Sequence, residues 1–167
     1  PRLIEWWVVN LACLRMGAVV CPGTTQLKAK DIAYRLQASE AVCVIADGGV
    51  APEIDAVVDG CPGVGVRILV GDSRAGWETY EEIVPVAGDG FETVDSAADD
   101  PAILYFTSGT TGFPKMTLHT HVSYPLGHRI TGEFWLDLGP DDLHWNVSDT
   151  GWAKAAWSSL FGPWNMG

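Results

Sequence analysis

A stretch rich in glycine and hydroxyl groups, TSGTTGFPK, follows directly after an apolar run. Its two glycines let the backbone approach a ligand closely and adopt positive φ, so successive N–H groups can point into one concavity that suits an anion. Four short hydroxyl side chains add donors without bulk, and the lysine adds a positive charge. This combination fits a polyphosphate. The candidate residues are Thr107, Ser108, Gly109, Thr110, Thr111, Gly112, Phe113, Pro114 and Lys115.

Established phosphate-binding patterns do not match this stretch. Gly109 and Gly112 are three positions apart, and Lys115 follows Phe113 and Pro114, so the G-x-x-x-x-G-K-[ST] pattern is absent. The dinucleotide pattern G-x-G-x-x-G is absent from it too. From the residue types alone, a polar surface loop between two strands stays open as the alternative.

The longer sequence LYFTSGTTGFPKM resembles the phosphate-binding signature of the adenylate-forming enzymes, nearly position for position. This superfamily includes acyl-CoA synthetases, luciferases and peptide-synthetase adenylation domains, and the signature is highly specific. The resemblance extends upstream to GAVVCPGTTQLKAKDIAYRLQASEAVCVIA. Downstream, PDDLHWNVSDTGWAKAAWSSLFGPW resembles the medium-chain acyl-CoA synthetase branch and its acetyl-CoA synthetase relatives.

The resemblance implies an activity and a set of small-molecule partners. Thr107–Lys115 would wrap the β- and γ-phosphates of ATP with Mg²⁺, a carboxylic acid of short or medium chain would become an acyl-adenylate, and the thiol of coenzyme A would then displace AMP. Two alternatives stay open: an adenylation domain that loads a carrier protein, and a non-catalytic protein that binds nucleotide.

The resemblance also implies that residues 1–167 are a fragment of the large N-terminal AMP-binding domain. The catalytic lysine would then lie downstream, in a C-terminal domain absent from this chain, so we expect no catalytic residue here and no turnover by the isolated fragment. Both ends also read as cut, because the chain starts within the first turn of a helix and ends in aromatic residues. The rest of the polypeptide would be its main protein partner.

A second candidate segment, SDTGW, precedes a predicted helix. By resemblance, Asp149, Thr150, Gly151 and Trp152 border the acyl-substrate and ATP region. The alternative is local: Asp149 or Thr150 caps the helix that starts at residue 152, and Trp152 belongs to the core.

Metal binding is not expected from the histidines or cysteines. His119 and His121 fall on one face of a strand, but no nearby cysteine or carboxylate completes a ligand set. His128 and His144 are predicted to make local hydrogen bonds. Three cysteines lie in apolar runs and are predicted to be buried structural thiols: Cys13, Cys21 and Cys43.

Alternating strands and helices must position these segments. We predict helices at 2–16, 28–39, 51–59, 121–135 and 152–161, with one short helix in the acidic stretch 71–100. We predict strands at 18–21, 41–46, 66–70, 102–106, 115–119 and 143–147. The run at 41–46 is apolar throughout, as expected for a strand buried on both faces, and 66–70 is again predicted to be a buried strand. The pattern indicates an α/β fold with a mainly parallel sheet flanked by helices. The candidate loop follows the carboxyl end of a strand, where such sheets bind ligands.

Composition limits the other possible partners. The 167 residues are 47% apolar, with 21 acidic and 10 basic side chains and a net charge of −11. This balance repels nucleic acid and anionic membranes. The apolar N-terminal stretch carries Arg2, Glu5 and Arg15 and is broken by Gly17, so a buried helix is predicted rather than a membrane span. The expected compartment is the cytoplasm, or the mitochondrial matrix in a eukaryote.

Overall fold

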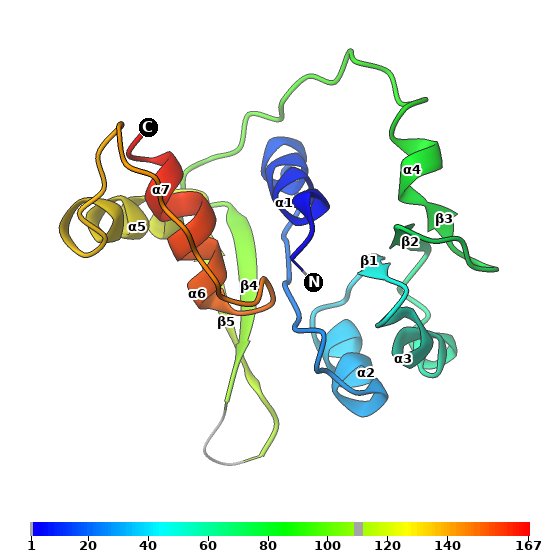
Figure 1. Cartoon of the computed structure of the whole chain (residues 1–167). Helices are drawn as coiled ribbons and strands as arrows, with labels where there is room; N and C mark the ends of the chain where they lie inside the picture. The colour runs from blue at the N-terminus through cyan, green and yellow to red at the C-terminus, as the bar shows by residue number, and fades with distance from the viewer. Residues whose placement is uncertain (1, 109–111) are drawn as a thin grey trace. The chain divides into compact units, whose positions relative to one another are not determined.

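The computed structural model describes residues 2–108 and 112–167 and divides into two compact units (Figure 1). Unit 1 takes the described residues of Pro1–Thr24 and Thr93–Gly167, and unit 2 is Thr25–Glu92. Within the described ranges, no helix is both long and apolar enough to span a membrane.

Unit 2 is a three-stranded parallel sheet in the order β1-β2-β3. The strands are Cys43–Asp47 (β1), Val66–Val70 (β2) and Glu78–Thr79 (β3). The helical elements are α2 (Ala29–Ala38), α3 (Ala51–Asp55), the 3₁₀ helix η1 (Val58–Gly60) and α4 (Tyr80–Ile83). Its core combines one side chain from β2 with residues of the surrounding elements: Ile32, Ala51, Ile54, Leu69 and Trp77.

The α2 helix begins without a cap from its own sequence, and a carboxylate from α3 supplies one. Glu53 Oε2 accepts the N–H of Ala29 at 2.9 Å, and its Oε1 pairs with the Lys28 ammonium at 3.1 Å. The hydrogen bond from Ala29, followed by that from Lys28, lowers the pKa of Glu53. Because the N-terminus of a helix leaves donors unpaired, this carboxylate ties α3 to α2.

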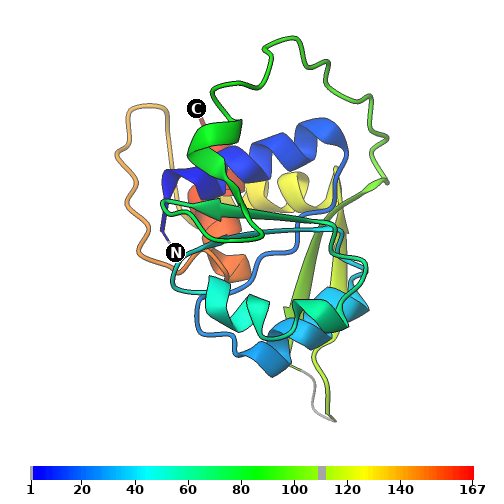
Figure 2. The ribbon, with the colours of Figure 1, turned by 90° about the vertical axis from the view of Figure 1, so that its right-hand side faces the viewer.

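Unit 1 contains an antiparallel hairpin of β4 (Pro101–Thr107) and β5 (Lys115–Thr120). Figures 1 and 2 show these two strands side by side. The helices of unit 1 are α1 (Ile4–Met16), α5 (Ser123–Phe134), α6 (Ala153–Ala156), the π-helix η2 (Trp157–Phe161) and α7 (Gly162–Trp164). The buried core of the unit joins β4, α5, α6 and η2: Ala102, Ile103, Tyr105, Tyr124, Ala156, Leu160 and Phe161.

Two helix ends follow directly from the sequence. The α1 helix stops at Gly17, whose φ of +69° is left-handed. Glycine adopts this conformation readily, and it commonly ends a helix. Before α5, the Thr120 N–H donates to Ser123 Oγ at 2.9 Å, and the Ser123 N–H donates to Thr120 Oγ1 at 3.1 Å. This reciprocal pair resembles a capping box just ahead of α5, whose N-cap residue, Val122, provides no side-chain cap.

Three predictions about strands are wrong. Residues 18–21 form only a single parallel bridge, in which Val20 pairs with Ile103. Residues 143–147 are not a strand, because their backbone has no partner strand among the described residues. The β1 strand is not buried on both faces: Ile45 is 38% exposed and Cys43 is also exposed.

The prediction for the cysteines is wrong in part as well. Cys21 and Cys43 are exposed, Cys13 is half-buried, and the buried thiol is Cys61. Cys61 packs within unit 2, where its sulfur lies 4.0 Å from the Ala33 carbonyl oxygen. None of the four described cysteines forms a disulfide.

Candidate phosphate-binding site

The β4–β5 hairpin presents the candidate loop between two paired strand ends. Thr107 and Lys115 are directly opposite in the antiparallel register, and Thr107 Oγ1 donates to the Lys115 carbonyl oxygen at 3.4 Å. The loop therefore leaves and re-enters the sheet at a defined pair of residues. The predicted site residues Gly109, Thr110 and Thr111 lie outside the described residues.

The described part of the loop is exposed and contains a glycine with positive φ. Gly112 has a φ of +120°, which side chains with a Cβ rarely adopt, so glycine is required there. Phe113 is 67% exposed, and Thr107, Ser108 and Lys115 are also exposed. The described side chains thus leave their polar groups accessible to a ligand.

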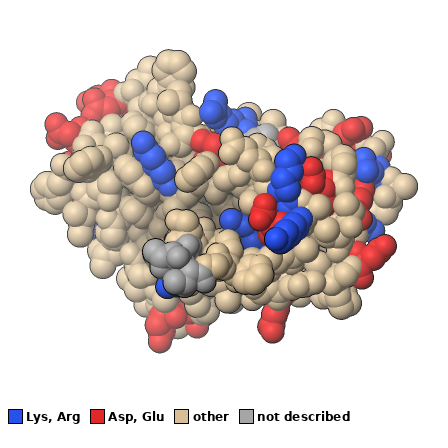
Figure 3. Space-filling view, turned by 90° about the horizontal axis from the view of Figure 1, so that it is seen from below, with Lys and Arg blue, Asp and Glu red and all other residues tan. Residues whose placement is uncertain are grey.

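The Lys115 ammonium carries an uncompensated charge. Among residues 2–108 and 112–167, no carboxylate lies within 4.0 Å of its nitrogen. Figure 3 shows basic and acidic side chains interspersed on a mostly uncharged face, without one continuous positive patch. A polyanion would therefore be recognised by local groups and not by the general field of this acidic protein.

The Asp149–Trp152 segment forms a tight turn ahead of α6. Asp149 Oδ1 accepts the Gly151 N–H at 2.9 Å, and the Asp149 carbonyl oxygen accepts the Trp152 N–H at 3.1 Å. Thr150 is 4% exposed. Trp152 takes the position before the first helical residue, and no side chain caps the helix. The alternative of a cap by Asp149 or Thr150 is therefore wrong, because the Asp149 carboxylate is used within the turn.

Gly151 has no room for a side chain. A Cβ there would lie 2.3 Å from both the backbone nitrogen and the Cα of Thr24, and 2.4 Å from the Gly23 carbonyl carbon. The turn thus packs directly on the backbone of residues 23–24. Trp152 is 58% exposed, so its assignment to the core is wrong. Its role beside a substrate remains a prediction.

Sequence reasoning missed a cluster of aromatic and imidazole rings behind the hairpin. Tyr105 of β4 and His119 of β5 contact Tyr124 of α5 at centroid distances of 5.9 Å and 4.7 Å. His128, one turn later on α5, lies 4.3 Å from Tyr124 and stacks on Trp157 at 5.8 Å. The four-residue spacing of Tyr124 and His128 was the available signal, since such pairs share a helix face.

Burial shifts the titration of these rings. It raises the pKa of Tyr105, whose hydroxyl oxygen has no hydrogen-bond partner among the described residues, and it raises the pKa of Tyr124 to about 12. Burial, followed by the charge of His119, lowers the pKa of His128 to about 4. Burial also lowers the pKa of His119. The cluster therefore favours neutral rings and fixes the hairpin against α5 and η2.

The predicted hydrogen bonds of His128 and His144 are confirmed. His128 Nδ1 lies 3.3 Å from Thr131 Oγ1, and His144 Nε2 lies 2.6 Å from the Ser158 carbonyl oxygen. In the part of the chain that the structure describes, no group of three or more His, Cys, Asp or Glu side chains could hold a metal ion. His119 belongs to the ring cluster instead.

The π-helix η2 exposes carbonyl groups that ring nitrogens can reach. The Ser158 carbonyl is in contact with His144, and the Ser159 carbonyl accepts the indole N–H of Trp7 at 3.1 Å. The helix closes with the wide hydrogen bond from the Gly162 N–H to the Trp157 carbonyl. Segments far apart in the sequence are thereby attached to one helical turn.

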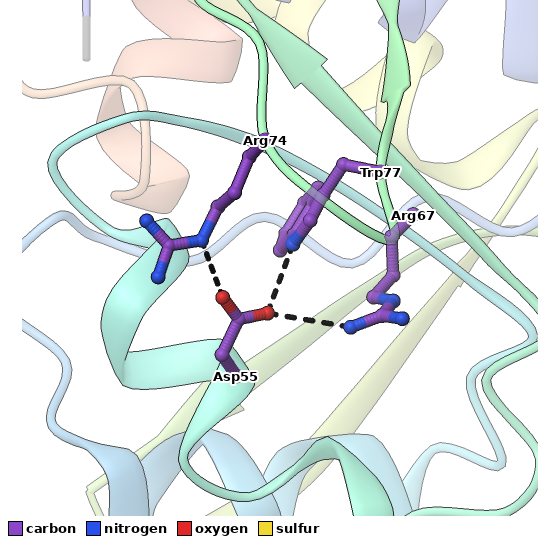
Figure 4. Close-up of polar contacts among 4 residues, drawn as sticks. All are labelled: Asp55, Arg67, Arg74 and Trp77. Carbon is purple, nitrogen blue, oxygen red and sulfur yellow. Dashed lines mark hydrogen bonds and ion pairs between the residues drawn. The ribbon is translucent and has the colours of Figure 1, made fainter.

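The Asp55 carboxylate of unit 2 accepts hydrogen bonds from three neighbouring side chains (Figure 4). Asp55 Oδ1 accepts from Arg67 Nη1 at 3.3 Å and from Trp77 Nε1 at 2.9 Å, while Asp55 Oδ2 accepts from Arg74 Nε. Burial alone would raise the pKa of Asp55, but the hydrogen bonds from Trp77 and Arg74 and both guanidinium charges lower it overall. The arrangement joins α3 to the strand β2 and to the segment before β3.

Comparison with known proteins gives the family. The model of the family described as AMP-binding enzyme matches residues 1–167. The chain belongs to this family. The match covers the hairpin loop and the Asp149–Trp152 turn, which lie in two of the three segments that carried the resemblance in the sequence.

Similar curated proteins are much longer than this chain. It is 52% identical to the Mus musculus protein named acyl-coenzyme A synthetase ACSM3, mitochondrial, over 168 residues, covering 100% of this chain and 29% of that protein. It is 46% identical to Homo sapiens acyl-coenzyme A synthetase ACSM4, mitochondrial, with the same coverage. The chain thus spans less than a third of the length of these relatives.

Two solved structures share the fold. The anthranilate CoA ligase AuaEII in complex with anthranoyl-AMP matches with a TM-score of 0.92 and 24% identity, covering 98% of this chain and 32% of that one. The Brucella canis acyl-CoA synthetase matches with a TM-score of 0.86 and 24% identity, covering 100% and 30%. The prediction of an α/β fold is confirmed.

Proposed function

We propose that these residues are part of an ATP-dependent ligase that converts a carboxylic acid to an acyl-adenylate and then to an acyl-CoA thioester. Membership of the AMP-binding family supports this reaction class. The single observation that carries the proposal is the hairpin loop, in which a glycine at positive φ, accessible hydroxyls and an unpaired lysine meet between two paired strand ends.

The proposed role of Thr107–Lys115 is electrostatic. When a carboxylate oxygen attacks the α-phosphorus of ATP, the bond to the β,γ-pyrophosphate breaks and negative charge accumulates on the leaving group. The Lys115 ammonium and the hydroxyls of Thr107 and Ser108 would position and stabilise that charge. These residues need not transfer a proton.

Bound Mg²⁺ would add positive charge at the phosphates. The described residues contain no cluster of carboxylates for it, so it would be held through phosphate oxygens, water and hydroxyl groups of the loop. The hydroxyl-rich composition of Thr107–Thr111 is compatible with this hard cation.

The proposed acid is a short- or medium-chain fatty acid, and coenzyme A is the proposed thiol. The printed names of the relatives, acyl-coenzyme A synthetases, favour coenzyme A over a carrier protein. Asp149, Thr150, Gly151 and Trp152 are proposed to border the substrate, because the exposed indole of Trp152 offers an apolar wall beside a rigid turn. Both named relatives are mitochondrial. For this chain we propose the cytoplasm or, in a eukaryote, the mitochondrial matrix.

The 167 residues are proposed to act only within a longer polypeptide that supplies the catalytic lysine and the remaining contacts to ATP. The coverage of 29% of each named relative supports this division. The isolated chain is then expected to show no turnover.

Carboxylate-dependent ATP–pyrophosphate exchange tests the proposal. The complete natural reading frame containing these residues is assayed with a series of acids from acetate to long-chain and aromatic ones. Exchange that peaks for one size class supports adenylation. Release of AMP with coenzyme A, but not with a carrier protein that bears a free thiol, identifies the acceptor. A folded protein that binds ATP but exchanges pyrophosphate with none of these acids would be a non-catalytic nucleotide binder, contrary to the proposal.

A further inference from the structure

Tyr124 of α5 is a buried side chain that contacts both strands of the hairpin. Its ring centroid lies 5.9 Å from that of Tyr105 on β4 and 4.7 Å from that of His119 on β5. Tyr105 precedes Thr107 by two residues, so the two side chains belong to the same face of β4. The ring of Tyr124 therefore supports the strand that leads into the candidate phosphate loop.

The hydroxyl group of Tyr124 reaches the helix that follows the Asp149–Trp152 turn. It donates to the Ala153 carbonyl oxygen at 3.0 Å, and Ala153 is the first residue of α6, directly after Trp152. Burial raises the pKa of Tyr124 to about 12, so the hydroxyl keeps its proton and remains a donor at neutral pH. One buried side chain thus contacts the hairpin with its ring and the start of α6 with its hydroxyl.

The hydrogen bond from Tyr124 is not needed for α6 to form. The Ala153 carbonyl oxygen also accepts the backbone N–H of Trp157, as the hydrogen-bond pattern of a helix requires. Loss of the tyrosine hydroxyl would therefore leave this carbonyl with a partner. The contact from Tyr124 fixes where α6 starts and not whether it is a helix.

Trp152 depends on the backbone on either side of it for its position. On one side, Gly151 packs against the backbone of Thr24, and on the other side Ala153 is held by Tyr124. The indole itself is 58% exposed. A shift at Ala153 would therefore move the exposed indole with little resistance from the core.

We propose that Tyr124 is a positioning residue that holds the Asp149–Trp152 turn at a fixed place relative to the phosphate hairpin. The inference rests on the function proposed above, in which the hairpin binds the phosphates of ATP and the turn borders the carboxylic acid. Attack of the carboxylate on the α-phosphorus requires both substrates to be held at a defined distance and angle. Tyr124 acts on this geometry through Ala153 and through the two strands.

ATP–pyrophosphate exchange by the complete natural protein tests the inference with a variant that keeps the ring. Tyr124→Phe removes the donor to Ala153 and is expected to raise the KM for the carboxylic acid about fivefold, while the KM for ATP changes less than about twofold. Tyr105→Phe is the matched control, because it removes a buried hydroxyl whose oxygen has no hydrogen-bond partner among the described residues. It keeps the ring that Tyr124 contacts, so both KM values should stay as in the wild type.

Three outcomes of this assay are decisive. An unchanged KM for the acid in Tyr124→Phe would overturn the inference, because the hydroxyl would then serve only the core. Equal increases in Tyr124→Phe and Tyr105→Phe would also overturn it, since altered core packing would be their common cause. A wild-type protein that exchanges pyrophosphate with no acid would refute the proposed function, and the inference with it.

A double-mutant cycle with Trp152→Ala tests the route. If Tyr124 acts through Trp152, the two substitutions disturb the same contact with the acid, and their effects are not additive. Tyr124→Phe should then raise the KM for the acid about fivefold in the wild-type background but less than about twofold in the Trp152→Ala background. The same increase in both backgrounds would overturn the proposed action on the turn. Melting temperatures measured in parallel set an assay temperature at which every variant is folded.

Discussion

The charged groups of Lys115 in the hairpin and Asp55 in unit 2 differ in whether neighbouring side chains pair with them. Asp55 receives hydrogen bonds from two arginines and a tryptophan, so that one carboxylate organises three elements of its unit. Lys115 ends a strand with its ammonium exposed and with no carboxylate within 4.0 Å among the described residues. The first arrangement uses charge for structure, and the second leaves charge available to a ligand.

An unpaired charge is not sufficient evidence of a site. Lys30 of α2 is also exposed and also lacks a carboxylate partner among the described residues. Lys115 differs because it adjoins a glycine at positive φ and a run of hydroxyl residues. A charged side chain that lacks an acidic partner is therefore a candidate for ligand binding only where the backbone conformation around it also favours a ligand.

The largest expected effect is on catalysis. Lys115→Ala in the complete protein is expected to slow ATP–pyrophosphate exchange about 100-fold, equivalent to about 2.7 kcal/mol, because the charge on the leaving pyrophosphate loses its cation. The melting temperature should change little, because the side chain makes no ion pair within the described chain. Lys30→Ala is the matched control and should leave exchange unchanged. Equal exchange rates in the two variants would mean that the loop only connects β4 to β5 and does not act on the phosphates.

A smaller effect is expected from Gly151→Ala. The new methyl group would overlap the backbone of Thr24 and Gly23, which cannot rotate away as a side chain could, so the free energy of unfolding should fall by about 2 kcal/mol. The displaced turn should also weaken substrate binding. Gly127→Ala in α5 is the control, because a Cβ there meets nothing within 4 Å and alanine favours a helix. Chemical denaturation of both variants measures the difference; equal stability would show that the turn can move freely.

Asp55→Asn tests whether the charge at Asp55 acts on structure alone, in contrast to Lys115, for which we propose a role at the phosphates. The substitution leaves two guanidinium groups without their carboxylate, and we expect a loss of about 1–2 kcal/mol, limited by the 28% exposure of the aspartate side chain. Exchange of pyrophosphate should be unaffected under conditions where the protein stays folded. Urea denaturation checks the stability, with the exposed Asp59→Asn as control. A stable protein with impaired exchange would contradict the division between the two charges.

The smallest effect is the pH dependence of His128. Its pKa in the folded protein is about 4, below the ordinary value of about 6.5, so the unfolded chain binds more protons between these values. The free energy of unfolding should therefore fall between pH 7 and pH 5, by about 1 kcal/mol after allowance for the partial exposure of the ring. His128→Phe keeps a ring beside Tyr124 and Trp157 and should remove this part of the slope. An unchanged slope would mean that His128 titrates normally.

Segments with local signals were predicted well from the sequence. The 66–70 strand has the predicted bounds, and the hairpin on either side of the candidate loop forms as expected. The helix that begins after Thr120 has a reciprocal pair of hydrogen bonds just ahead of it. In each of these, apolar spacing or a nearby polar group decides the structure, and both are visible in a short stretch of sequence.

Features that depend on distant residues could not be predicted. The structural reason for glycine at position 151 is the backbone of Gly23 and Thr24, far away in the sequence. The 143–147 segment has the composition of a strand and lacks a partner among the described residues. The ring cluster forms only where two strands and two helices meet. The spacing of residues within one segment does not predict which other segments will contact it.

The π-helix η2 limits which insertions and deletions unit 1 can tolerate. Each residue of an α-helix turns its successors by about 100°, so deleting one residue within Trp157–Phe161 would rotate everything that follows. Asn165, whose side-chain amide donates to the carbonyls of Pro125 and Phe161, would then face a different side of its helix. Gly132, at which a Cβ would lie only 2.7 Å from the Gly162 carbonyl oxygen, would no longer be opposite that residue. Insertions and deletions in this part of the gene are therefore expected to be selected against even where single substitutions are tolerated.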